Sequence, residues 1–187
     1  MMRLLTSLLL VVAAFAVLAF LHSTTPSYAV LTGPLETFGP QRQTVESDIF
    51  SLKANKVLRA KTLAFKRYGS PVSLDTQGIF VIVTADAETK HETMPLRAAA
   101  IEGASGRLYR QSHRADGAPQ LFSDKTLQPG LPASGLFIFE MPEEETAGMT
   151  LIVSRQPGPQ LDAEIHIRLD QNGIETRKIA EIGENGL

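Results

Sequence analysis

The feature that most constrains the fold is the segment of residues 127–142, LQPGLPASGLFIFEMP. Pro129 and Gly130 interrupt regular structure near its start, and Pro142 cannot donate the backbone hydrogen bond that would prolong a strand at its end. Between them, residues 136–141 alternate with the period of two that is typical of a β-strand. Both alternating faces are largely apolar, so we predict a central strand that is covered on both sides.

From residue 44 onward, the chain indicates further short strands separated by turns. Residues 79–85, IFVIVTA, form a second apolar strand, which we expect to lie near residues 136–141. Residues 161–169 alternate most regularly, and we expect Leu161 and every second residue after it to face the core, while Asp162, Glu164, His166 and Arg168 face water. Other strands are predicted at residues 49–54, 58–66, 96–101, 107–111 and 149–154, of which the second also fits a short helical turn.

The segments between these strands carry turn and loop signals. Residues 103–106, GASG, suit a hairpin turn, and the polar residues 112–125 indicate an exposed loop. The predicted organisation is therefore a signal peptide or membrane anchor at residues 1–29, a linker at 30–43, a β-sandwich domain at 44–170 and a polar C-terminal tail at 171–187. The fold class predicted is all-β, an immunoglobulin-like antiparallel β-sandwich with an N-terminal hydrophobic helix.

The N-terminal segment is an uncharged run of 18 residues, 4–21, preceded by Arg3. As a cleavable signal peptide it would be cut after Ser27-Tyr28-Ala29, whose small residues fit a signal peptidase. As an uncleaved anchor it is just long enough to span a membrane, and Arg3 would keep its start in the cytoplasm. Both interpretations put the remainder outside the cytoplasm, either as a single-pass membrane protein with its C-terminal domain outside or as a secreted protein.

Composition excludes several classes of function. The net charge of −2 argues against a nucleic-acid partner, because such proteins present clustered basic side chains. The chain has no cysteine, which excludes disulfides, cysteine-ligated metals and a cysteine nucleophile.

Few residues are candidates for chemistry. The histidines, His22, His91, His113 and His166, show no spacing typical of metal ligands, so we interpret them as solvated. The acidic run of residues 143–145 and the segment 170–173, DQNG, are interpreted as turns, since neither has the ligand spacing of a calcium loop. No serine lies in a G-x-S-x-G context. We therefore predict no catalytic, cofactor-binding or metal-binding residues and no cofactor.

Three pieces in this order, GIFVIVTADAETK, GRLYRQS and LQPGLPASGLFIFEMP followed by MTLIVS, carry a family resemblance. The chain resembles, over about residues 44–169, the telokin-like, immunoglobulin-like extracellular domains of unknown function from Gram-positive bacteria. The recurring segment of that family is matched here by Pro129, Gly130, Gly135, Phe137, Phe139, Glu140 and Pro142. Members are often attached through a lipidated cysteine, which this chain lacks, so anchoring would fall to the N-terminal helix. The resemblance implies no catalytic residues.

The function expected from these observations is that of a non-enzymatic extracytoplasmic binding or interaction module, anchored through residues 4–21 or secreted. Its expected partner is another envelope or extracellular protein. The alternative is an envelope-associated hydrolase or an enzyme accessory subunit, which would need a pocket where titratable groups converge.

Overall fold

The computed structural model of the chain describes residues 2–26 and 28–187, so Met1 and Ser27, the first residue of the predicted cleavage segment, lie outside the described residues. The chain divides into two compact units, Met1–Gly33 and Pro34–Leu187. The first unit contains helix α1 (Met2–Thr24) and the single turn α2 (Tyr28–Leu31). Within α1, Leu5–Thr24 has a mean hydropathy of 2.4 and is long and apolar enough to cross a membrane. The predicted N-terminal hydrophobic helix is thus confirmed.

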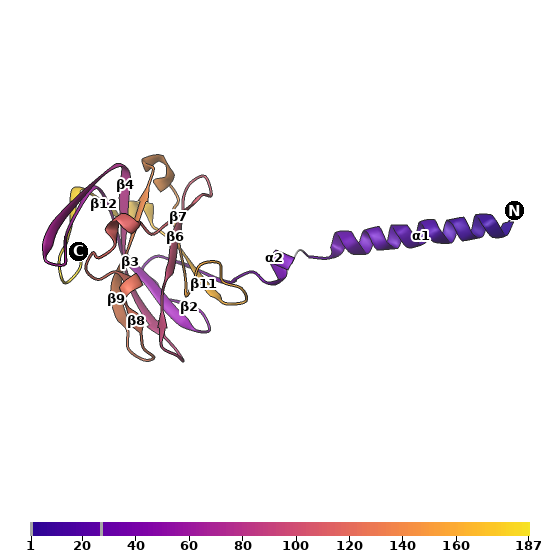
Figure 1. Cartoon of the computed structure of the whole chain (residues 1–187), viewed down its shortest axis with the longest axis horizontal. Coiled ribbons are helices and arrows are strands. Elements are labelled where there is room, and N and C mark those ends of the chain that lie inside the picture. Colours follow the sequence, from indigo (N-terminus) through magenta and orange to yellow (C-terminus); the bar gives the residue numbers. More distant parts are fainter. Residues whose placement is uncertain (1, 27) are drawn as a thin grey trace. The chain divides into compact units, whose positions relative to one another are not determined.

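The second unit consists of β-strands joined by turns and short 3₁₀ helices (Figure 1). One sheet, which we call the β11 sheet, has the strand order β1-β11-β10-β6-β7. A second, the β4 sheet, has the order β12-β3-β4-β9 with β2 paired to β3, and β5 and β8 form a separate two-stranded sheet. The strands are β1 (Leu35–Pro40), β2 (Val45–Glu46), β3 (Phe50–Arg67), β4 (Ser70–Thr89), β5 (Met94–Pro95), β6 (Ala98–Glu102), β7 (Leu108–Arg110), β8 (Thr126–Leu127), β9 (Ala133–Met141), β10 (Thr150–Ser154), β11 (Ala163–Arg168) and β12 (Ile174–Ile182).

The inner faces of the two sheets pack together into one core, which makes the unit a β-sandwich as predicted. Apolar side chains from both sheets are buried there, among them Val81 and Phe139 of the β4 sheet and Ile101, Leu151 and Ile165 of the β11 sheet. The predicted neighbours β4 and β9 pair antiparallel, with Val81 opposite Phe139. Alternation along these strands is what directs the apolar residues inward.

The outer face of the β4 sheet is covered by residues 112–125, which were predicted to form an exposed loop. The polar segment 112–125 is not an exposed loop, because Ala115, Ala118, Leu121 and Phe122 are buried. The first three join a second apolar cluster with Ile138 and other outward side chains of β3, β4, β9 and β12, while Phe122 joins the inner core. The apolar residues of segment 112–125 thus close this face, and the prediction that residues 136–141 are covered on both sides is confirmed. Their strand, β9, is not central as predicted, because it is the last strand in the order β12-β3-β4-β9. On its far side the described residues form only single bridges, between Gln111 and Phe139 and between Leu121 and Leu136.

The predicted linker and tail are also wrong in part, since residues 35–40 form β1 and residues 174–182 form β12. Both strands lie at sheet edges and pair in parallel, β1 with β11 and β12 with β3. Pro40 is compatible with a strand there, because an edge position leaves one side of the backbone without ladder bonds. A Cβ on Gly39 would come within 2.3 Å of the Val45 side chain, so this glycine permits close packing.

Other predicted strands merge or shift. The two strands predicted at residues 49–54 and 58–66 form one long strand, β3, with irregular pairing between Ala54 and Lys56. Strand β11 begins at Ala163, so Leu161 is not directed to the core. It is exposed and adopts a positive φ of 48°, a turn conformation before the strand.

Candidate functional site

The outer face of the β11 sheet is open to solvent and brings polar groups from distant segments into rows. The register places Glu36 of β1 opposite Glu164 of β11, and Phe38 opposite His166. On the other side of β11, His166 lies opposite Ile152 and Arg168 opposite Thr150. Because side chains two apart on a strand share a face, these residues all point outward.

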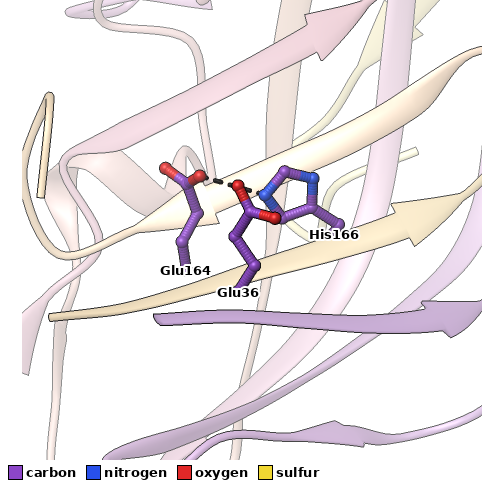
Figure 2. Close-up of side chains that lie close together, drawn as sticks. All are labelled: Glu36, Glu164 and His166. Carbon is purple, nitrogen blue, oxygen red and sulfur yellow. Dashed lines mark hydrogen bonds and ion pairs between the residues drawn. The ribbon is translucent and has the colours of Figure 1, made fainter. Parts of the chain in front are cut away.

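Glu36, Glu164 and His166 form a cluster on this face (Figure 2). Their potential ligand atoms all lie within 4.8 Å of one another. His166 Nε2 is 3.0 Å from Glu164 Oε1, the pair joined by the dashed line in Figure 2. The three side chains converge from two adjacent strands, although Glu36 is far from the other two in sequence.

His166 is held more tightly than a surface residue. It is only 8% exposed, and the ring of Phe38 covers it with 4.8 Å between ring centroids and 42° between ring planes. His166 does lie on the outward face of the sheet, as predicted. The prediction that it is solvated is wrong, because neighbouring side chains bury it. Glu164 is half-buried and Glu36 is exposed, so the cluster is reached from solvent on the Glu36 side.

A groove of about 350 Å³ runs along the same face, next to the cluster. Its floor is made of small or apolar side chains of β6 and β10, including Ala98, Ala100 and Ile152. Leu108 of β7 forms part of its wall and is 61% exposed. Glu164 lines the groove as well, so the cluster and the groove adjoin.

The other predicted surface residues are not brought into this cluster. His113 is 95% exposed at its side chain and lies 3.4 Å from Asp116, while His22 and His91 are exposed in α1 and in the turn after β4. Asp170 accepts a hydrogen bond from the Asn172 backbone at 3.0 Å, which agrees with the predicted turn at residues 170–173.

The acidic run at residues 143–145 forms a 3₁₀ helix (Glu143–Thr146) and is not uniformly solvated. Glu145 is buried, and the backbone N–H of Ser105 donates to its Oε2 at 3.0 Å. Hydrogen bonds from Ser105 lower the pKa of the Glu145 carboxyl, and the hydrogen bond from Lys61 lowers that of Glu143. A Cβ on Gly103 would come within 2.6 Å of Glu145 Oε2, so Glu145 is a structural residue that braces the 103–106 turn.

Sequence reasoning missed the cluster because it treated Glu36 as part of a linker and sought metal ligands only at helical spacings. One available signal was Glu164-x-His166 on a predicted strand, since residues i and i+2 of a strand share a face. The second carboxylate had no local signal, because the parallel pairing of β1 with β11 alone brings it to that face.

Comparison with known proteins supports the fold. The chain is similar to the solved structure of the yjhA protein from Bacillus subtilis, with a TM-score of 0.53 and 16% identity over 70% of this chain and 99% of that one. It is also similar to an uncharacterized β-sandwich protein from Clostridium difficile (TM-score 0.48, 13% identity, 77% and 99% covered) and to the secreted protein MPT63 from Mycobacterium tuberculosis (TM-score 0.48, 18% identity, 72% and 97% covered). No protein-family model and no curated protein matches the chain.

Proposed function

We propose that this chain is a non-enzymatic, extracytoplasmic binding module of the immunoglobulin-like, telokin-like type. It is anchored through residues 4–21, or secreted after cleavage behind Ala29, and its partner is another envelope or extracellular protein. The observation that carries this proposal is the groove on the open face of the β11 sheet, whose floor and wall expose apolar side chains.

The N-terminal unit supports the extracytoplasmic location. Helix α1 carries no acidic or basic side chain after Arg3 until His22, and Leu5–Thr24 matches the length needed to cross a hydrocarbon core. The positive charge of Arg3 favours a cytoplasmic N-terminus, which directs the C-terminal domain outward.

The groove supports recognition of a protein. Its volume of about 350 Å³ lies within the range of ligand pockets, and its small floor residues leave room for a partner's side chain. Leu108 is well exposed at the wall, and it lines the same groove as the floor side chains of Ala100 and Ile152. We infer that a partner's apolar side chain fills the space beside Leu108 and thereby removes apolar surface on both proteins from water.

Two of the serine hydroxyl groups that line the groove make hydrogen bonds within the domain. Ser154 Oγ donates to the Gln156 carbonyl at 3.0 Å, and Ser112 Oγ donates to Glu140 Oε2 at 3.4 Å. Neither hydroxyl is hydrogen-bonded to a histidine, the arrangement that activates a serine nucleophile.

Site-specific photo-crosslinking in cells tests this proposal. A photoreactive amino acid at Leu108 is expected to form an adduct with one envelope protein. The same amino acid at Tyr68, which is 94% exposed in the β3–β4 turn of the other sheet, is expected to form none. Ala100→Arg fills the groove floor and should reduce the Leu108 adduct by about tenfold or more.

Other outcomes of the crosslinking experiment would contradict the proposal or favour its alternative. Equal adducts from Leu108 and Tyr68, or a Leu108 adduct that Ala100→Arg leaves unchanged, would show that the groove is not the binding surface. An adduct with an envelope enzyme, whose activity then depends on Ala100, would instead favour the accessory-subunit alternative.

A further inference from the structure

We propose that Glu36, Glu164 and His166 bind a divalent transition-metal ion of the zinc class. The cluster supplies two carboxylate oxygens and one imidazole nitrogen from adjacent strands (Figure 2). Three protein ligands with room for a water or a further ligand are typical of an open zinc site. The inference concerns the cluster alone and does not depend on the proposed partner.

The geometry already approaches that of a ligand set. A zinc ion holds its ligands at about 2.0–2.2 Å, which puts neighbouring ligand atoms about 3.3 Å apart. His166 Nε2 and Glu164 Oε1 are 3.0 Å apart, close to that spacing. The distances from the Glu36 carboxylate to the ligand atoms of Glu164 and His166 are within 4.8 Å. To reach the spacing of zinc ligands, the exposed Glu36 side chain would change rotamer, which does not disturb the core.

The charges around the cluster favour a cation. Several other acidic side chains have basic partners: Glu46 pairs with Lys90, Glu140 with Arg114, Glu143 with Lys61 and Glu175 with Lys56. Among the described residues, no lysine or arginine forms an ion pair with Glu36 or Glu164, and Glu164 Oε1 lies 3.0 Å from His166 Nε2. Two carboxylates this close repel each other unless a positive charge lies between them, and a metal ion supplies that charge.

The imidazole determines which cation fits. Calcium and magnesium prefer all-oxygen ligand sets, whereas a neutral imidazole is a good ligand for zinc, copper, iron and nickel. The ring of Phe38 and the burial of His166 fix the imidazole so that one nitrogen faces the carboxylates. A bound ion would also join β1 to β11 across the edge of the sheet, because each strand supplies at least one ligand.

Calorimetric titration of the full chain, purified in detergent without a polyhistidine tag and stripped with a chelator, tests the site. Zinc is expected to bind saturably with one ion per chain and a micromolar Kd. It should also raise the melting temperature, because an ion that binds only the native state stabilises it. Glu36→Gln should weaken binding by about tenfold or more, a cost above about 1.4 kcal/mol, and Glu164→Gln and His166→Asn should abolish it.

Matched variants separate this site from ordinary surface histidines. His113→Asn removes an exposed histidine that also lies beside one carboxylate, and it should leave zinc binding unchanged. Glu36→Gln changes only an exposed side chain, so it reports on the site even where His166→Asn fails to fold. The inference is overturned if no saturable zinc binding is found, if Glu36→Gln has no effect, or if His113→Asn weakens binding as much. Binding of calcium or magnesium with the same affinity as zinc would equally contradict an imidazole-ligated site.

Discussion

Phe139→Asp is expected to leave the domain largely unfolded at 25 °C. Phe139 is completely buried in the core between the sheets, opposite Val81 on the neighbouring strand. The substitution removes a large apolar side chain and puts an unpaired carboxylate in its place. Each change alone costs about 3–5 kcal/mol, and their sum is comparable with the whole stability of a domain of this size.

Thermal unfolding followed by circular dichroism of the purified, detergent-solubilised chain measures this effect. Tyr68→Asp is the matched control, because Tyr68 is almost fully exposed and its positive φ of 50° is one that aspartate tolerates. The control should melt within about 2 °C of the wild type. A Phe139→Asp variant that melts with the wild type would contradict the burial of β9 in the core of the sandwich.

Phe122→Ala is expected to destabilise the domain by about 3–5 kcal/mol, or about 10 °C in melting temperature. Phe122 comes from the segment that the sequence indicated as an exposed loop, yet its ring is fully buried and stacks on Phe137 with 4.7 Å between centroids. A Cβ on Gly135 would come within 2.8 Å of this ring, so the glycine in β9 leaves the space that the ring occupies. Alanine would leave a cavity that this tight packing cannot close.

Urea unfolding of the same variant, monitored by circular dichroism, gives the free-energy change directly. Leu131→Ala serves as the control, since it removes an apolar side chain that is already exposed in a nearby turn. If Phe122→Ala were as stable as Leu131→Ala, the segment of residues 112–125 would not contribute an essential side chain to the inner core.

The two strands that are buried on both faces could be predicted from the sequence because their pattern is local. Residues 79–85 and 136–141 alternate over several residues, and burial on both faces leaves both alternating sets apolar. The hairpin through residues 103–106 was predictable for the same reason, since its turn residues lie between two alternating runs.

The edges of the sandwich could not be predicted in this way. Strand β1 contains Gly39 and Pro40, which normally signal a linker. Gly39 is needed because the Val45 side chain packs where a Cβ would lie, and this contact cannot be recognised from the local sequence. Strand β12 buries Ala180 and Ile182 but exposes most of its other side chains, so it has little apolar pattern. In both cases parallel pairing to a distant strand, not local sequence, determines the structure.

The candidate site depends on those same edges. Glu164 and His166 lie on a strand that was predicted, although it begins at Ala163 and not at Leu161, whereas Glu36 reaches them only through β1. The burial of His166 likewise depends on Phe38, which follows Glu36 on that strand. A site made across a non-local strand pair has no spacing that could be recognised in the sequence.

The central claim, that the β-sandwich lies outside the cytoplasm, can be tested by labelling a single cysteine in intact spheroplasts. The native chain has no cysteine, so Tyr68→Cys introduces one well-exposed thiol in the β-sandwich. We expect a membrane-impermeant maleimide to label it in intact cells, while a cytoplasmic marker protein stays unlabelled until the membrane is opened. Labelling of Tyr68→Cys only after the membrane is opened would place the sandwich in the cytoplasm and contradict the account.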